Sequence, residues 1–293
     1  MSLITQLEQF SITAVDIPIN DIYDFKDELS DEYESFTVEK RNGTLHFVSN
    51  GGYQTRNSST IWCIREADKI YGWKDFPKIK IFTSDGQFYK PGDFTYASDN
   101  LDYERVVPDF NFRHWKESKI YDYEETCREI SEAGKHDFSI DKAGWIGNID
   151  TNVYRVKLLE MGLRYNIHLD IFSSVDKERP KFLSLPDLVK TYSMLIDIEG
   201  FGYSGRLKYL LFSKRPLLLA DRPNKEYFFE FLKPWVHYIP VNRNLEDLIE
   251  KVNWVRANYA SALEIAENAC KFANEFCTRD AAFKQWDKII TAL

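Results

Sequence analysis

From about residue 141 onward, short apolar segments alternate with amphipathic ones, and this alternation limits the folds open to the chain more than any other feature. The apolar segments that we interpret as strands are 142–147, 167–172, 192–198, 216–220 and 237–241. The amphipathic segments 153–163 and 204–213 have the residue spacing of helices. Strands that alternate with helices are typical of βαβ units, in which the strands run parallel. We therefore predict an α/β fold with a parallel sheet in this part of the chain.

The chain before residue 141 is less regular and rich in aromatic residues. The pair Asn42-Gly43 separates two strand-like segments and predicts a type I′ hairpin, because both residues tolerate positive φ. Segment 78–83 has a short strand pattern and runs into a polar tip that contains Asp85. The Gly-, Pro- and Asp-rich segment 86–100 predicts a loop. A carboxylate is therefore expected where a strand ends.

The C-terminal end of the chain is predicted to be helical. Asn244 can cap a helix over 245–256, with Asp247 at the third position. The apolar faces of the two helices that follow carry Leu263, Ala266, Cys270 and Cys277, and then Trp286, Ile289 and Ile290. The two cysteines are thus expected to be core residues.

Length and composition narrow the class of protein. A chain of 293 residues, 44% of them hydrophobic, is long enough for two domains or one large α/β unit. The net charge of −8 argues against general nucleic-acid binding, so small-molecule partners are expected. Four scattered cysteines favour neither a disulfide framework nor a structural zinc site.

The sequence does not suggest a membrane segment. We find no run of about 18–20 apolar residues that would span a bilayer. The first residues lack the basic start and long apolar run of a signal peptide. We therefore expect a protein without a transmembrane segment that works in the cytoplasm.

The segment most typical of a ligand site is the glycine-rich turn after residue 198. Gly200, Gly202 and Gly205 lie between an apolar strand and a helix expected to begin at Ser204. Free amides and the helix dipole at such a turn favour an anion, which glycines allow to approach closely. Arg206 and nearby Lys208 add positive charge, which indicates a phosphate partner. Neither a GxGxxG nor a P-loop pattern is present, so a simple βα turn with surface basic residues remains the alternative.

Several motifs together resemble one known family. They are the run from Gly202 to Leu211, Asp221-Arg-Pro, Glu226-Tyr-Phe-Phe and Leu232-Lys-Pro-Trp-Val-His-Tyr-Ile-Pro240. Weaker landmarks are Val107-Pro-Asp-Phe110, Lys142-Ala-Gly-Trp-Ile-Gly147 with Arg155, and Ile81-Phe-Thr-Ser-Asp85. This set resembles glycosyltransferase family 90, the CAP10 or lipopolysaccharide-modifying family that includes protein O-glucosyltransferases.

The resemblance implies a GT-B fold, in which two Rossmann-like domains face a cleft. It places an acceptor-side domain at 1–140, a nucleotide-sugar domain at 141–270 and a C-terminal helix, 271–293, that returns to the N-terminal domain. It further implies an inverting transferase that needs no metal, with UDP-glucose or UDP-xylose as donor. The implied acceptor is a carbohydrate such as a glycan, lipopolysaccharide or capsule precursor, and a lipid-linked acceptor would bring the protein to a membrane surface.

The resemblance also implies donor-binding residues, which by position in the motifs are Gly147, Arg155, Gly202, Tyr203, Ser204, Gly205 and Arg206. Glu226 would accept hydrogen bonds from the ribose hydroxyls, although a solvated acid on a short helix is the alternative.

The chain departs from the family at the strand that ends in Gly147. The family commonly has Trp-Arg-Gly there, whereas this chain has Trp145-Ile146-Gly147. Arg155 is the nearest replacement for the missing diphosphate contact, and an inactive sugar-nucleotide or glycan-binding relative is the second hypothesis.

An inverting transfer needs a base, and Asp85 is the predicted one, because it follows a strand end that would face the cleft. Asp75 and Asp93 are its rivals, and a turn-capping role is its structural alternative. Asp197 and Glu199 could form a metal-binding acidic pair as in GT-A transferases, a hypothesis that we disfavour. No histidine forms a pattern typical of a hydrolase triad.

Overall fold

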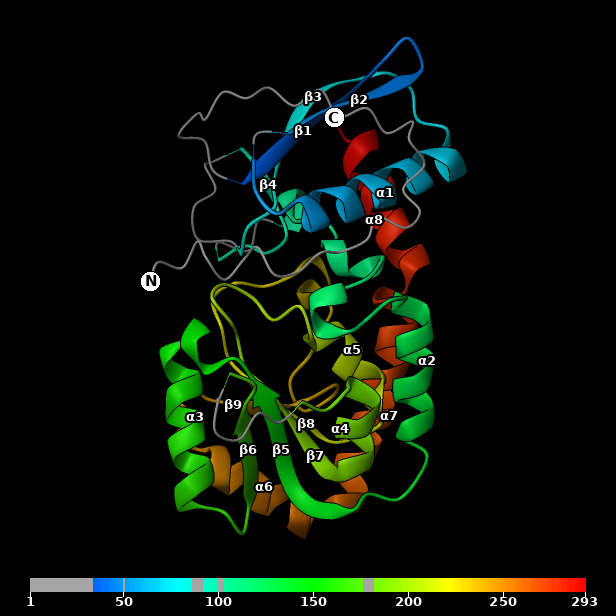
Figure 1. The fold of residues 1–293 in the computed structure, drawn as a ribbon. Helices are drawn as coiled ribbons and strands as arrows, with labels where there is room; N and C mark the ends of the chain where they lie inside the picture. The colour runs from blue at the N-terminus through cyan, green and yellow to red at the C-terminus, as the bar shows by residue number, and fades with distance from the viewer. Residues whose placement is uncertain (1–33, 50, 86–91, 100–102, 176–181) are drawn as a thin grey trace, which may run out of the picture.

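The computed structural model describes residues 34–49, 51–85, 92–99, 103–175 and 182–293, which form two β-sheets and the helices around them (Figure 1). The strands are β1 (Ser35–Arg41), β2 (Thr44–Ser49), β3 (Phe76–Phe82), β4 (Phe94–Thr95), β5 (Ile140–Gly147), β6 (Leu169–Ser173), β7 (Tyr192–Asp197), β8 (Leu217–Ala220) and β9 (Ile239–Val241). The α-helices are α1 (Gln54–Tyr71), α2 (Tyr123–Ala133), α3 (Val153–Arg164), α4 (Leu185–Thr191), α5 (Leu207–Leu210), α6 (Leu248–Ala257), α7 (Tyr259–Phe276) and α8 (Arg279–Thr291). Short 3-10 helices include η3 (Phe110–Phe112), η6 (Leu211–Ser213) and η7 (Tyr227–Glu230).

The N-terminal sheet has the order β2-β1-β3-β4 and is mixed, with only the β3–β4 pair parallel. The predicted hairpin is confirmed: Arg41 pairs with Thr44, and the turn residues Asn42 and Gly43 have φ of 51° and 74°. The predicted strand near 78–83 is β3. Of the loop predicted at 86–100, residues 86–91 and 100 lie outside the described residues, and β4 occupies part of the remainder.

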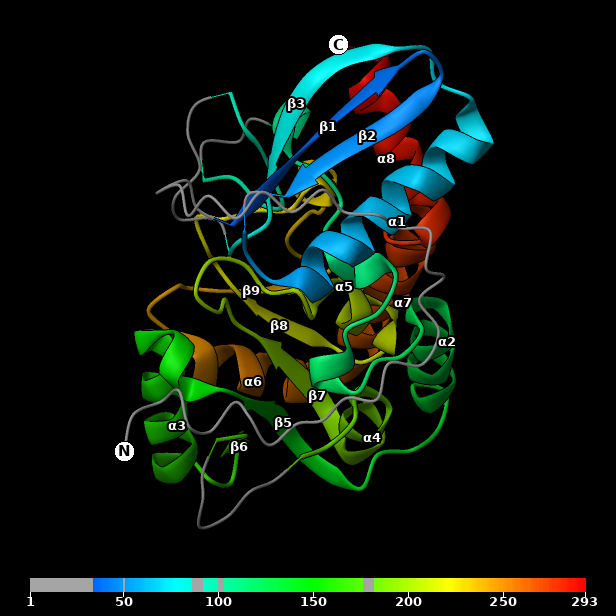
Figure 2. The same cartoon turned by 45° about the horizontal axis from the view of Figure 1, so that its top comes forward.

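Helix α1 was not predicted, and it lies across the N-terminal sheet (Figure 2). Its buried side includes Asn57, Ser59 and Thr60 beside Ile61 and Ile64. These polar side chains interrupt the apolar stripe by which a helix is recognised from sequence.

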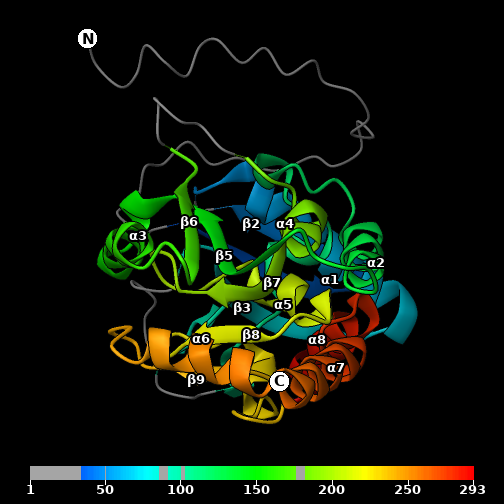
Figure 3. The same ribbon diagram turned by 90° about the horizontal axis from the view of Figure 1, so that it is seen from below.

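The second sheet is parallel throughout, in the order β6-β5-β7-β8-β9. The predicted α/β fold and parallel sheet are confirmed. All six residues of the central strand β7 are buried, as expected for a parallel sheet covered on both faces. Figure 3 shows α3 and α6 on one face of this sheet and α4 on the other. The core on the α4 face continues into the N-terminal half of the protein.

The C-terminal helices differ from prediction only at their ends. Helix α6 begins at Leu248, three residues later than predicted, and Asn244 is not its cap because Leu245 adopts a positive φ of 63°. Helices α7 and α8 carry the predicted apolar faces, and α8 packs against α1 (Figure 2). The proposed domain boundaries and the pairing of two Rossmann-like units stay predictions. None of the helices in the described ranges has the length and apolar character needed to cross a bilayer.

Candidate active site

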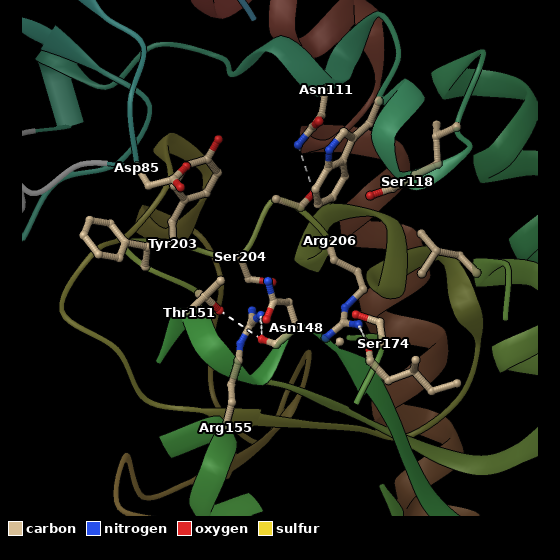
Figure 4. Close-up of a pocket in the computed structure, with 18 of the residues that line it drawn as sticks. Asp85, Asn111, Ser118, Asn148, Thr151, Arg155, Ser174, Tyr203, Ser204 and Arg206 are labelled. Atoms are coloured by element: carbon tan, nitrogen blue, oxygen red, sulfur yellow. Dashed lines mark hydrogen bonds between the residues drawn. The ribbon is translucent and has the colours of Figure 1, made fainter. Parts of the chain in front are cut away.

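A cavity of about 370 Å³ lies at the carboxyl end of the parallel sheet, between the two halves of the protein (Figure 4). In chain order the strands run 2-1-3-4-5 across the sheet, so the order reverses between β5 and β7. The crevice outside such a switch point is where open α/β sheets bind ligands. Gly147 ends β5 and Asn148 follows it, Gly200 lies just after β7, and all three line the cavity.

The glycine-rich segment 200–206 forms one wall of the cavity, but it does not lead into a long helix. Helix α5 has four residues, begins at Leu207 and has Arg206 at its N-cap, so the helix predicted to begin at Ser204 was too long at its start. The Ser204 hydroxyl donates to Asp197 Oδ1 at 2.8 Å, which ties the turn to the end of β7. Positive charge at this wall of the cavity therefore comes from side chains such as Arg206 rather than from a helix dipole.

Arg206 reaches the wall formed by the end of β5. Its Nη1 donates to the Ile146 carbonyl at 2.5 Å, and its Nε lies 3.6 Å from Asp197 Oδ1 without a hydrogen-bond partner among the described residues. Burial lowers the pKa of the Arg206 guanidinium from its ordinary value, and Asp197 opposes that shift. Arg206 also lines the cavity, and a guanidinium at a cavity wall is suited to an anionic ligand.

Arg155 lines the same cavity, but each of its three nitrogens already donates to a backbone carbonyl. It donates to the carbonyls of Asn148, Ile198 and Glu199 at 2.9, 3.2 and 2.8 Å. Burial and the nearby Arg206 charge lower the pKa of Arg155 to about 9. Arg155 therefore joins the loops after β5 and β7, and in this conformation it is not free to replace the arginine that the family has at Ile146.

Lys208 has a partner within the chain. Its Nζ donates to Asp109 Oδ2 at 2.8 Å and to the Gly205 carbonyl at 3.1 Å, and both side chains of the ion pair are almost fully buried. The prediction that Lys208 binds an anionic ligand was wrong, because Asp109 already supplies its negative partner. This pair could not be predicted from sequence, since the two residues lie 99 positions apart. Asn111 also donates to Asp109 and to the Gly205 carbonyl, at 3.0 and 3.3 Å.

Asp85 enters the cavity from the N-terminal half, three residues after β3 ends. Its Oδ1 accepts from Arg56 Nη1 at 2.9 Å. Gly202 brings the two halves together here, because a Cβ at this position would lie 1.2 Å from the Asp85 carbonyl oxygen. In the view of Figure 4, Asp85 and Tyr203 lie on one side of the cavity and Arg206 and Ser174 on the other.

Glu226 does not line the cavity, which differs from its predicted role. It is 2% exposed, so it is not the solvated acid of the alternative either, and neither of its carboxyl oxygens has a hydrogen-bond partner among the described residues. Burial raises the pKa of the Glu226 carboxyl to about 8, although Lys208 and Arg222 oppose this shift. The group is therefore neutral at pH 7.

Glu226→Gln is expected to be more stabilising at high pH than at low pH. The folded carboxyl keeps its proton up to about pH 8, while the unfolded one loses it near the model-compound value of 4.5. The contribution of Glu226 is thus fully present below pH 4.5 and lost as pH rises to 8, by at most about 1.4 kcal/mol per pH unit.

Urea denaturation of both proteins at pH 5, 6.5 and 8 measures this difference. Glu230→Gln, at an exposed position four residues away, is the control and should show no such trend. A Glu226→Gln difference that is constant across pH would contradict a buried neutral carboxyl.

The acidic pair Asp197 and Glu199 is held by cations from the chain. Asp197 Oδ2 accepts from Arg222 at 2.7 Å, and Glu199 Oε1 accepts from Arg243 at 2.9 Å. The two carboxylates are therefore engaged in ion pairs rather than presented together as metal ligands. Across the described ranges, no cluster of three or more His, Cys, Asp or Glu side chains is placed to hold a metal ion.

Sequence reasoning missed three residues of the site: Arg56, Asp109 and Asn111. Arg56 lies in the first turn of the unpredicted helix α1, and Asp109 was noted only as part of a family landmark. Asn111 meets Gly205 so closely that a Cβ there would lie 2.5 Å from its Nδ2. Of these contacts, the sequence indicated only that Gly205 packs closely against another segment, because glycine has no side chain. It did not indicate that the partner is Asn111.

The fold and the cavity define an α/β protein with a candidate site at the switch point of its parallel sheet. The family model described as glycosyl transferase family 90 matches residues 67–292. The chain therefore belongs to glycosyl transferase family 90, which confirms the resemblance seen in its motifs.

Individual relatives match shorter stretches. Human protein O-glucosyltransferase 3 is 34% identical over 106 residues, which are 36% of this chain and 21% of the relative. Zebrafish (Danio rerio) protein O-glucosyltransferase 2 is 30% identical over 160 residues, 51% of this chain and 32% of the relative. The matches thus span about a third or less of these relatives' lengths. Among solved structures, Anabaena HepE in complex with UDP-glucose aligns with a TM-score of 0.37 and 12% identity over 57% of this chain and 45% of that chain.

Proposed function

We propose that this protein is an inverting, metal-independent glycosyltransferase with a GT-B arrangement, which moves glucose or xylose from a UDP-sugar to a carbohydrate acceptor. Membership of family 90 supports the class of reaction. The names of the O-glucosyltransferase relatives favour a glucosyl donor, while the acceptor proposal rests on the family resemblance alone.

The observation that carries the proposal is a carboxylate and an arginine brought to one cavity from opposite halves of the chain. Asp85 comes from the N-terminal half and Arg206 from the parallel-sheet half. In the proposed reaction Asp85 takes the proton of the acceptor hydroxyl, whose oxygen forms the new bond to the anomeric carbon. The bond from that carbon to the diphosphate breaks, and Arg206 stabilises the charge that develops on the leaving group.

Arg206→Ala is expected to weaken UDP binding by roughly 10- to 150-fold, since a hydrogen bond to a charged group contributes about 1.5–3 kcal/mol. Calorimetric titration with UDP measures this loss. Arg113→Ala is the control, because Arg113 packs on Trp62 and does not line the cavity. Equal UDP affinity in the wild type and Arg206→Ala would remove Arg206 from the donor site.

The reaction itself is tested by incubating the protein with UDP-glucose or UDP-xylose and candidate glycans, in the presence of EDTA. Release of UDP together with a glycosylated product supports the proposal. Activity that EDTA abolishes and manganese restores would contradict metal independence.

A second function has one observation in its favour. Ile146 gives the cavity an apolar wall where the family pattern has an arginine. A protein that binds UDP-sugars or glycans without transferring the sugar would fit this change. Nucleotide binding without UDP release across all donor and glycan pairs would favour this function.

A further inference from the structure

The carboxylate of Asp85 is held by a second residue that enters the cavity, Arg56. The Nη1 of Arg56 donates to Asp85 Oδ1 at 2.9 Å and to the Thr83 carbonyl at 3.2 Å. Thr83 immediately follows β3. The same guanidinium therefore binds the backbone of the loop and the side chain that the loop carries.

Arg56 is itself fixed in place. It lies in the first turn of α1, and its guanidinium carbon lies 4.6 Å from the ring centre of Tyr53 and 5.1 Å from that of Phe110. Burial alone would lower the pKa of Arg56, but Asp85, Tyr203 and Tyr96 raise it above its ordinary value. A guanidinium that lies over aromatic rings while one of its nitrogens donates to two acceptors is an arrangement that lysine reproduces only in part.

Among the residues that the structure describes, only Oδ1 of the Asp85 carboxylate has a hydrogen-bond partner. Arg56 occupies Oδ1, and no described residue donates a hydrogen bond to Oδ2. The Asp85 side chain is one-third exposed, so a ligand hydroxyl can reach it. An oxygen that keeps an unused lone pair at a cavity wall can accept a proton from that hydroxyl.

We infer that Arg56 is a positioning residue that fixes Asp85 through Oδ1 and directs Oδ2 to the acceptor hydroxyl. This inference rests on the proposed function of Asp85. In the transfer step the hydroxyl proton goes to Asp85 Oδ2, while the acceptor oxygen bonds to the anomeric carbon and the bond to the diphosphate breaks. Arg56 stays protonated throughout, so it acts only through Asp85.

The test is a double-mutant cycle of Arg56→Gln and Asp85→Asn, with transfer rates and UDP affinity measured for each protein. Arg56→Gln is expected to lower kcat by at least about tenfold, because misplacement of a reacting group by about an ångström has effects of that order or larger. Its UDP affinity should equal that of wild type. In the Asp85→Asn background, Arg56→Gln should produce no further loss of transfer, since residues that act as a unit are not additive.

Arg56→Lys keeps the charge and serves as a second variant if Arg56→Gln does not fold; its kcat is expected to lie between those of the wild type and Asp85→Asn, and a wild-type kcat would contradict the inference. Arg65→Gln is the matched control, because Arg65 is another α1 arginine that packs on an aromatic ring, Phe47, and does not line the cavity. It should leave kcat unchanged.

Two outcomes separate this inference from the proposed function. If Asp85→Asn retains wild-type transfer, the assignment of the base itself is wrong. If Asp85→Asn loses transfer but Arg56→Gln leaves kcat unchanged, or lowers it by the same factor in both backgrounds, Asp85 remains the base and Arg56 is not its positioning residue.

Discussion

Asp85→Asn is expected to reduce sugar transfer by at least roughly a hundredfold while UDP affinity stays at the wild-type value. Asparagine keeps the size of the side chain, and its oxygen can still accept the hydrogen bond from Arg56. The substitution therefore removes the base with little change in packing. Transfer rates at saturating donor and calorimetric UDP titrations measure the two quantities separately.

Asp75→Asn is a matched control in the same half of the protein, at the residue that precedes β3. Asp75 accepts hydrogen bonds from the backbone amides of Gly43 and Asn42 at 2.9 and 2.7 Å, and these bonds lower the pKa of its carboxyl. It therefore closes the β1–β2 hairpin and does not line the cavity. Neither does Asp93, the other rival. If Asp85→Asn keeps normal turnover while Asp75→Asn or Asp93→Asn loses sugar transfer, the base is that other aspartate and not Asp85.

The parallel sheet could be predicted because its strands are buried on both faces and read as apolar runs. In β7 every residue from Tyr192 to Asp197 is buried, so the segment is apolar along most of its length. Helix α1 could not be recognised in the same way, because its buried side uses Asn57 and Thr60. Asn57 accepts a hydrogen bond from Thr83, and Thr60 pairs with Tyr96. Such polar packing depends on partners that sequence periodicity does not reveal.

The candidate site likewise contains residues that local sequence indicates and contacts that it does not. Ser204, Gly205 and Arg206 could be singled out because glycines and charges gather within a few residues of a strand end. The contacts that fix them join distant segments, such as Asn111 with Gly205, which lie 94 residues apart. Glu226 shows the opposite case: its motif suggested a ligand contact, whereas tertiary packing buries the side chain outside the cavity.

Lys208→Met is expected to lower the free energy of unfolding by about 3–5 kcal/mol, because it leaves Asp109 as an unpaired buried charge. The side chains of this pair are 1% and 2% exposed, so water cannot replace the lost ammonium group. Lys214→Met is the matched control, since Lys214 pairs with Glu267 at 3.1 Å where both side chains are more exposed. That variant should lose no more than about 1 kcal/mol. Urea denaturation compares the two, and equal losses would contradict a buried charge pair.

The double variant Asp109→Asn/Lys208→Met distinguishes an unpaired charge from lost packing. Asparagine keeps an oxygen for the Asn111 amide but carries no charge. The double variant should therefore be more stable than Lys208→Met alone, because the uncompensated carboxylate is gone. Lys208 and Asn111 both bind the Gly205 carbonyl, so every variant that breaks this network should also weaken UDP binding next to Arg206. A double variant that is less stable than Lys208→Met would show that the loss comes from packing and not from charge.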